Sequence, residues 1–438
     1  LTGNPQITFF KVVYRRHTNF SMECIRQTVS GIMQLGGKGT ATISRNGDLI
    51  SQIYMTYKLS SKTGDAVVSN FGNALIKNAE VEIGGQLIDR QDGRFMQVYT
   101  DLTEPNPSAN PCGLLKHQKM SGLGANFADT VGDSSNYSTT VKTDKLYWVP
   151  LKFWFCRNPG LALPLIALQY HEVKVSVELE EGSKLTTGVT GKSKSITNSD
   201  DFQKNDCNLW VDYIYLDTDE RRRFAQVSHE YLIEQVQVKK SNVSLTGERD
   251  DIDLNFNHPV KELMWVFTGS TDNSLKNGFF PGCAVQSVPD DAIFNTADDT
   301  NASVFNINSS LNGSINNTAI ETIKSIPPTT TFKLTLNGQD RFQERDTFYF
   351  ANTQVYKHHT GSGAPFPVGS IHVYSFALKP EEHQPSGTCN FSRIDSSKLN
   401  IEYNTSTSDS LIKEIHVYAV NYNVLRIMSG MGGLAYSN

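Results

Sequence analysis

Apolar and polar residues alternate with a period of two along most of the chain, which predicts many short β-strands. Within 209–216, for example, odd and even positions fall on opposite strand faces, and both faces carry large apolar residues. A convincing 3.6-residue period persists nowhere, although one short helix fits Gly93 to Leu102. The predicted strands lie near 20–29, 40–45, 48–59, 74–89, 146–156, 171–180 and 208–216, and then near 230–240, 251–256, 260–268, 331–336, 346–350, 371–378, 398–403 and 411–420.

The stretch 208–240 lies near the middle of the chain and has the features of a junction between two halves. Its apolar segments, 209–216 and 231–238, are expected to be strands that belong to different cores. Between them, Asp217 to Arg223 carries acidic residues followed by consecutive arginines, a composition that a buried strand does not tolerate. We therefore expect an exposed connection whose charges neutralise one another locally.

The two halves resemble each other in several segments that occur in the same order. Each match is weak by itself, but the offset changes only where one half carries an extra loop. Ordered matches of this kind indicate an internal duplication of an all-β unit. The matched pairs are 17–23 with 229–234, 47–55 with 258–266, 81–86 with 334–339, 148–153 with 372–376, and 210–215 with 415–420.

Three long polar insertions, 104–144, 181–206 and 269–328, are rich in small and polar residues and are expected to be surface loops. Antiparallel alternation with about seven or eight strands per half favours a β-sandwich, and a jelly roll is the eight-stranded form that tolerates long loops at one end. Gly84-Gly85 predicts a tight hairpin turn within the first half.

The expected organisation has four parts. An N-terminal arm that packs on the body covers 1–16, a first jelly roll 17–216, a linker 217–228 and a second jelly roll 229–438. Each half is long enough to bury roughly 70% of its unfolded surface, so neither needs a metal or a disulfide to fold.

Composition agrees with an all-β chain, because hydrophobic content is 38% and charged content only 19%. The formal net charge of −5 implies no bulk attraction to nucleic acid. The cysteines show no C-x-x-C spacing, so we expect buried free thiols rather than a zinc site or a disulfide framework. The longest apolar run, 161–168, contains a proline and is too short to span a bilayer.

No segment has the residue spacing of a known catalytic or metal-binding motif. The segment 36–40 lacks the first glycine of a P-loop and the Ser or Thr that directly follows its Lys, so a hairpin turn is expected. His358 and His359 are adjacent and would point to opposite faces of an extended strand, unlike a cupin His-x-His pair. The pairs 171–172 and 180–181 diverge in the same way, and no Gly-x-Ser-x-Gly elbow occurs. The sequence therefore predicts no enzyme, no metal site and no cofactor.

Asn-x-Ser/Thr sites without an intervening Pro occur nine times, and four of them fall in the insertion 269–328. In a chain this rich in Asn, Ser and Thr, many such sites arise by chance. The cluster is therefore stronger evidence for an exposed loop than for glycosylation. The candidate glycan acceptors are Asn301, Asn308, Asn312 and Asn316.

Several longer runs resemble the major capsid proteins of large icosahedral nucleocytoplasmic DNA viruses, and most closely those of the algal-virus (chlorovirus-like) branch. The resemblance spans nearly the whole chain, and such long ungapped runs are specific. The long insertions match this family poorly in length and content. The runs are LTGNPQITFFK at 1–11 with YRR at 14–16, PGLALPLIALQYHEV at 159–173, LNGQDRF at 336–342, QPSGTCNFSRID at 384–395 and NYNVLRIMSGMGGLAY at 421–436.

This resemblance implies a double jelly roll: two eight-stranded antiparallel barrels side by side in one subunit. It implies a homotrimer with a pseudo-hexagonal outline that tiles an icosahedral shell of a double-stranded DNA virus, in contact with neighbouring capsomers and minor capsid proteins. The insertions would face outward, and the arm 1–16 would lie at the inner side.

The resemblance also implies a location and an environment. The subunit would assemble in the host cytoplasm and end in the virion shell. Because an internal membrane and other proteins separate the shell from the DNA in this family, neither direct nucleic-acid contact nor a transmembrane segment is implied. Glycosylation in algal-virus relatives does not follow the usual sequon, so the four asparagines do not inherit that role from the family.

Three alternatives remain open at this point. A minor capsid or spike protein of the same fold would be scarce in particles, and a carbohydrate-binding β-sandwich would bind glycans as a monomer. A jelly-roll enzyme would hold a stoichiometric metal ion. The residues of the trimer contacts are not fixed by the sequence, although polar loops and the 217–223 connection are candidates.

Overall fold

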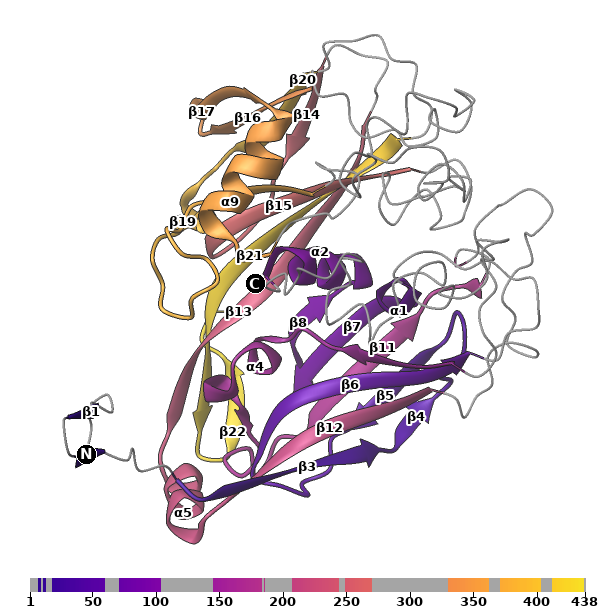
Figure 1. Cartoon of the computed structure of the whole chain (residues 1–438), viewed down its shortest axis with the longest axis vertical. Coiled ribbons are helices and arrows are strands. Elements are labelled where there is room, and N and C mark those ends of the chain that lie inside the picture. The colour runs from indigo at the N-terminus through magenta and orange to yellow at the C-terminus, as the bar shows by residue number, and fades with distance from the viewer. Residues whose placement is uncertain are drawn as a thin grey trace, which may run out of the picture.

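Two β-sandwiches joined by a short helix make up the described part of the chain in a computed structural model (Figure 1). Strands β1 (Ile7–Thr8) and β2 (Lys11–Val12) pair with each other and, within the described residues, with no other strand. The structure describes residues 7–8, 11–12, 18–59, 71–103, 145–182, 185, 207–243, 249–269, 330–361, 371–402 and 412–436.

The first sandwich contains eight main strands, which take the order 1-8-3-6 in one sheet and 2-7-4-5 in the other, the arrangement of a jelly roll. The first sheet, called the β3 sheet, consists of β3 (Phe20–Gln27), β12 (Cys207–Leu216), β6 (Leu49–Leu59) and β9 (Lys145–Pro150), with the short β10 (Leu163–Pro164) beside β6. The second consists of β5 (Lys38–Thr42), β11 (Val173–Leu179), β7 (Ile76–Ile83) and β8 (Gln86–Gln91), with the short β4 (Val29–Gly31) beside β5. Helices α1 (Phe71–Ala74), α2 (Gly93–Thr103) and α4 (Trp154–Arg157) and the short 3-10 helix η1 (Pro159–Leu161) accompany these strands.

The second sandwich repeats both strand orders. The β13 sheet consists of β13 (His229–Asn242), β21 (Ile412–Met428), β15 (Pro259–Gly269) and β18 (Ile371–Ser375), with β19 (Cys389–Asn390) beside β15 and β22 (Met431–Leu434) beside β21. Its other sheet consists of β14 (Arg249–Asp253), β20 (Ser397–Glu402), β16 (Thr331–Leu336) and β17 (Gln339–Asp346). The π-helix η3 (Tyr349–Thr353), helix α9 (Gln354–His358) and 3-10 helix η4 (Phe391–Arg393) complete it.

These strand orders confirm the double jelly roll, and the matched sequence segments occupy equivalent strands. Some matched pairs were out of register: the sequence match set Tyr54 against Trp265 and Trp210 against Ile415, in each case an outward-facing residue against one inside the second jelly roll. Trp210 pairs with Tyr54 and is half-buried, whereas Ile415 lies inside the second jelly roll. A shift by an odd number of residues turns every side chain to the other face, so the residues of neither pair can be equivalent.

Both jelly rolls turn from their fourth to their fifth strand through the same hairpin. Gly84 and Gly85 have φ of 59° and 83°, and Asn337 and Gly338 have φ of 50° and 76°. Two consecutive left-handed residues define a type I′ turn, which favours Gly-Gly and Asn-Gly. The predicted turn at Gly84-Gly85 is therefore confirmed.

The predicted exposed connection folds as helix α5 (Thr218–Gln226), which has no buried residue. The Asp217 side chain caps its first turn, which is acidic, and Arg223 lies in its last turn. This order of charges stabilises a helix through its dipole, so the pattern interpreted as local neutralisation is a helix signal. Arg221 also pairs with Asp48 of the first jelly roll at 2.9 Å.

Other strand predictions needed correction at their ends. The strand predicted over 146–156 ends at Pro150, and α4 follows it. The strand predicted over 346–350 is wrong, because β17 ends at Asp346 and the Asp346 carboxylate accepts a hydrogen bond of 2.9 Å from Tyr349 N at the start of η3. The predicted helix at 93–102 is confirmed as α2.

The strand predicted over 411–420 continues to Met428 and pairs with β13 along that strand's whole length. The sequence predicts too short a strand because the apolar pattern stops at the polar residues Asn421 and Asn423. Both residues are nevertheless buried. Gln237 Nε2 donates to Asn421 Oδ1 and Asn423 Nδ2 donates to Gln235 Oε1, each at 2.9 Å. These paired amides satisfy a polar ladder inside the strand pair.

The insertion 104–144 ends at the start of β9, and the insertion 269–328 begins at the end of β15. Leu59, the last residue of β6, lies opposite Lys145, the first of β9. Gly269, the last residue of β15, lies opposite Ile412, the first of β21. Nearly all residues of the insertions 104–144, 181–206 and 269–328 fall outside the described residues.

Candidate assembly surfaces

The apolar core of the first jelly roll continues onto the outer face of the β13 sheet, whereas the inside of the second jelly roll forms a core of its own. Along the β13 sheet, Trp265 turns into the second jelly roll, whereas its neighbours Met264 and Val266 turn toward the first. Tyr418 on β21 also turns toward the first jelly roll, and its ring centroid lies 5.6 Å from that of Phe95 on α2. Burying side chains of this size stabilises by roughly 1.5–3 kcal/mol each, so the contact holds the two halves as one unit.

A buried ion-pair cluster lies beside this core. Glu234 of β13 accepts from Lys261 Nζ at 2.6 Å and from Arg157 Nη1 of α4 at 2.7 Å. Lys261 Nζ also donates to the Pro380 carbonyl at 2.7 Å, and the Arg157 guanidinium lies 4.1 Å from the centre of the Tyr99 ring. Burial acts to raise the pKa of Glu234, but Lys261 and Arg157 together hold it below its usual range.

A second contact joins β8 to β13. Val236 N donates to Asp89 Oδ1 at 3.1 Å, and the Gln235 amide donates to the Ile88 carbonyl. Burial raises the pKa of Asp89 to about 6, and the hydrogen bond from Val236 opposes that rise. The outer edge of β8 is therefore covered by the second jelly roll.

His359 lies between two carboxylates at the end of α9. Its Nε2 is 3.3 Å from Glu262 Oε2, and its Nδ1 is 3.1 Å from Glu381 Oε1. Burial acts to lower the pKa of His359, but the two carboxylates raise it to about 9. Thr360 links the group to the first jelly roll by donating to the Thr103 carbonyl at 2.9 Å. His358 is the last residue of α9, so the two histidines do not lie side by side on an extended strand.

A third polar contact joins α2 to β21. Tyr418 Oη donates to the Asp92 carboxylate at 3.1 Å, and Arg94 Nη1 lies 3.0 Å from the His416 ring nitrogens. Burial, followed by the Arg94 and Lys240 charges, lowers the pKa of His416 far below its usual range, so its ring is neutral.

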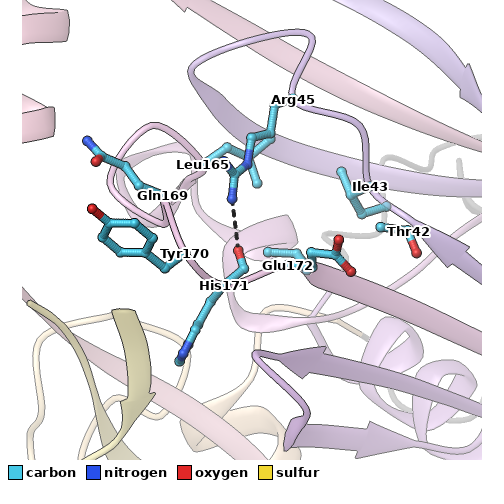
Figure 2. A pocket seen from close by; sticks show the side chains of 9 residues that line it. Thr42, Ile43, Arg45, Leu165, Gln169, Tyr170, His171 and Glu172 are labelled. Atoms are coloured by element: carbon cyan, nitrogen blue, oxygen red, sulfur yellow. Dashed lines mark hydrogen bonds between the residues drawn. The ribbon is translucent and has the colours of Figure 1, made fainter. Parts of the chain in front are cut away.

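A surface recess of about 390 Å³ in the first jelly roll is lined by residues that include Arg45, Tyr170 and His171 (Figure 2). Arg45 Nη2 donates to the carbonyls of Leu168 at 2.6 Å and His171 at 3.3 Å. The His171 ring points away from Arg45 toward β22, where its Nδ1 lies 2.9 Å from the Gly432 carbonyl. His171 and Glu172 therefore diverge, as predicted, and this site positions a chain turn between the jelly rolls.

The remaining sequence candidates are dispersed. The segment 36–40 turns into β5, and Lys38 pairs with Glu80 at 2.8 Å. The described residues contain no cluster of three or more His, Cys, Asp or Glu suited to a metal ion. Asn301, Asn308, Asn312 and Asn316 lie outside the described residues.

Of the described cysteines, Cys207 is buried, Cys156 and Cys389 are half-buried and Cys24 is exposed, and each carries a thiol rather than a disulfide. Cys112 and Cys283 lie outside the described residues. The expectation of buried thiols is wrong for Cys24 because β3 is an edge strand. No helix among the described residues is long and apolar enough to cross a membrane.

Comparison with known proteins covers nearly the entire chain. Residues 220–433 match the family described as large eukaryotic DNA virus major capsid protein, and residues 8–217 match the major capsid protein N-terminus. The major capsid protein of Pyramimonas orientalis virus is 43% identical, and that of Paramecium bursaria Chlorella virus 1 is 38% identical. Each alignment covers 100% of this chain and 96% of the relative.

Solved structures agree. A quasi-atomic model of the PBCV-1 virus capsid is 37% identical, with a TM-score of 0.76 over 98% of this chain and 100% of that chain. The Faustovirus major capsid protein, 13% identical over 97% of this chain and 93% of its own, shares the fold with a TM-score of 0.65. The chain therefore belongs to the major capsid protein family of large eukaryotic DNA viruses.

Proposed function

We propose that this major capsid protein works as a homotrimer with a pseudo-hexagonal outline, and that these trimers tile an icosahedral shell. The observation that carries the proposal is the repeated jelly roll. Both halves have the same two strand orders, and one buried interface fixes them as a unit. Three copies would supply six similar barrels, so a threefold assembly could pack like a sixfold tile.

The proposed division of the chain is an arm over 1–16, jelly rolls over 17–216 and 229–438, and a linker over 217–228. The family models support it, because they match 8–217 and 220–433 and meet at the start of α5. The role is structural and non-enzymatic, as supported by relatives that are themselves named capsid proteins.

We also propose which end of the trimer faces outward. The insertion 104–144 ends, and the insertion 269–328 begins, at a strand end that lies opposite the end of a neighbouring strand, and this end of each jelly roll would form the outer surface of the shell. Asn301, Asn308, Asn312 and Asn316 would then be glycan acceptors on that surface. Peptide mass spectrometry of protein from virions tests this directly, and unmodified peptides at all four asparagines would contradict it.

The partners follow from the same arrangement. Neighbouring capsomers would contact the sides of the trimer, and minor capsid proteins and the arm 1–16 would lie at its inner side, without direct contact with the genome. Assembly would take place in the host cytoplasm.

Imaging of single purified particles by electron microscopy tests the trimer. We expect six-lobed particles that contain three chains. Two-lobed particles with one chain each, at micromolar concentration, would contradict the proposal.

A further inference from the structure

One outer sheet face of the second jelly roll is covered within the chain. Met264 of β15, Tyr418 of β21 and Ile371 of β18 are almost completely buried on the β13 sheet, although they point out of their own jelly roll. Three elements of the first jelly roll contact this sheet. They are β8 through Asp89, α2 through Phe95 and α4 through Arg157.

Among the described residues, none of the second jelly roll covers the corresponding face of the first jelly roll. On the β3 sheet, Tyr54 pairs with Trp210 across β6 and β12, as Met264 pairs with Tyr418 in the other half. Tyr54, Trp210 and Trp148 of β9 are only half-buried. Their rings form a row, with centroids 6.0 Å apart for Tyr54 and Trp148 and 5.6 Å apart for Trp148 and Trp210.

The edge of this sheet shows the same difference. β13 contacts β8 through Gln235 and Val236. Its counterpart β3 is exposed along most of its length, including Phe20 and Met22, which are 58% and 54% exposed. A long exposed edge strand with apolar side chains is normally protected by a partner.

In the described part of the chain, the elements of the second jelly roll that correspond to this cover are exposed. β17, the counterpart of β8, is exposed at seven of its eight residues. α9 follows it as α2 follows β8, and Tyr356 on α9 is 88% exposed. Leu378, in the segment after β18 that corresponds to α4, is 75% exposed.

These two surfaces lie on opposite parts of the chain. Figure 1 shows β17 and α9 at the upper left, whereas β3 and β12 lie at the bottom of the first jelly roll. A single chain cannot bring them together without breaking its own interface. A second copy can, because the contact is head to tail.

We propose that β17, α9 and Leu378 of one copy pack on the outer face of the β3 sheet of the next copy, where Tyr54, Trp148 and Trp210 lie. The contact between copies would repeat the contact within the chain, with β17 meeting β3 as β8 meets β13. This inference rests on the proposed trimer. Three such contacts alternate with three intrachain contacts and close a ring of six jelly rolls.

The first test places charge on one surface without disturbing the fold. Tyr356→Glu combined with Leu378→Glu changes two exposed side chains, and the matched control Tyr170→Glu changes a residue that is also 75% exposed but lies outside both surfaces. Under conditions where the parent protein sediments as a trimer, we expect the double variant to sediment as a monomer and the control as a trimer. The far-ultraviolet circular dichroism spectrum should be unchanged in both variants, because all the substituted side chains are exposed.

The second test measures the solvent exposure of the other surface, the outer face of the β3 sheet. Trp154 and Trp265 are each 1% exposed, so quenching of fluorescence by acrylamide reports mainly Trp148 and Trp210. We expect these indoles to be protected in the parent trimer and quenched at least twofold more strongly in the Tyr356→Glu, Leu378→Glu variant. The substituted residues and the indoles belong to different jelly rolls, so a local structural effect would not produce this change.

The outcomes separate the two proposals. A double variant that remains a trimer, or a parent trimer whose indoles are quenched as strongly as those of the monomer, would overturn the assigned surfaces and leave the trimer standing. A parent protein that is itself monomeric would overturn both.

Discussion

Lys261 Nζ lies 2.6 Å from the Glu234 carboxylate, and Lys261 exposes only 1% of its side chain. Arg157 of the first jelly roll approaches the other Glu234 oxygen at 2.7 Å. One carboxylate thus binds a cation from each jelly roll. Because buried charges cost free energy unless they are paired, this cluster makes the position of one jelly roll on the other specific.

Replacing Glu234 with Gln should destabilise the protein strongly. The substitution preserves shape but leaves the Lys261 and Arg157 charges buried side by side without their shared anion. We expect the free energy of unfolding to fall by about 3–5 kcal/mol, measured by urea denaturation. Lys379→Met breaks an exposed ion pair with Glu382 and should change stability by less than about 0.5 kcal/mol. Equal effects of the two substitutions would contradict the account.

The His359 site predicts a loss of stability at alkaline pH. In the folded protein Glu262 and Glu381 raise the pKa of His359 to about 9, above its ordinary value of 6.5. The resulting stabilisation is complete below pH 6.5 and is lost as the pH rises through 9, with a total on the order of 3 kcal/mol. Urea titrations between pH 6 and 10 should show this decline, and His359→Gln should remove it. A parallel decline in both proteins would show that other groups are responsible.

The two glycines of the first hairpin should respond differently to alanine. Both have positive φ, so each substitution carries a backbone cost of about 1 kcal/mol. A Cβ at Gly85 meets nothing within 4 Å, whereas a Cβ at Gly84 would lie 2.3 Å from His171 Nδ1. His171 contacts Gly432 of the second jelly roll, so Gly84→Ala should disturb the contact between the halves. Thermal melting should show a clearly larger loss for Gly84→Ala than for Gly85→Ala, and the reverse order would refute this.

Helix α5 should depend on one aromatic side chain. Phe224 packs against Leu49, Ala162 and Ile214 on the first jelly roll. Because this side chain is only half-buried, Phe224→Ala should cost about 1–2 kcal/mol, less than a full core truncation. Arg222→Ala on the exposed side of the same helix is the matched control, and chemical denaturation of both variants would separate packing from helix propensity.

Much of the fold could be predicted because strands carry their pattern locally. The alternation around Trp210 and the Gly84-Gly85 turn each specify a conformation with few neighbours. β17 was missed because it is exposed on both faces and lacks apolar alternation. The end of β21 was missed because it contains the polar residues Asn421 and Asn423. These residues can be buried because they form hydrogen bonds with β13, which lies far away in the sequence.

The assembly surfaces could not be predicted from the sequence. Tyr356 and Leu378 look like core residues in the sequence, and only tertiary structure shows them exposed. The buried cluster around Glu234 unites residues from three distant strands and helices, so spacing gave no signal for it. Helix α5 could have been predicted from the sequence, because an Asp cap, an acidic first turn and a basic last turn together predict a helix.

The most direct test of the central claim is the native mass of the purified protein at micromolar concentration and after dilution. The account predicts a species of about 146 kDa, three times the 48.7 kDa chain, that persists on dilution because a closed ring buries apolar surface at each contact. A stable species of 48.7 kDa under the same conditions would contradict the trimer.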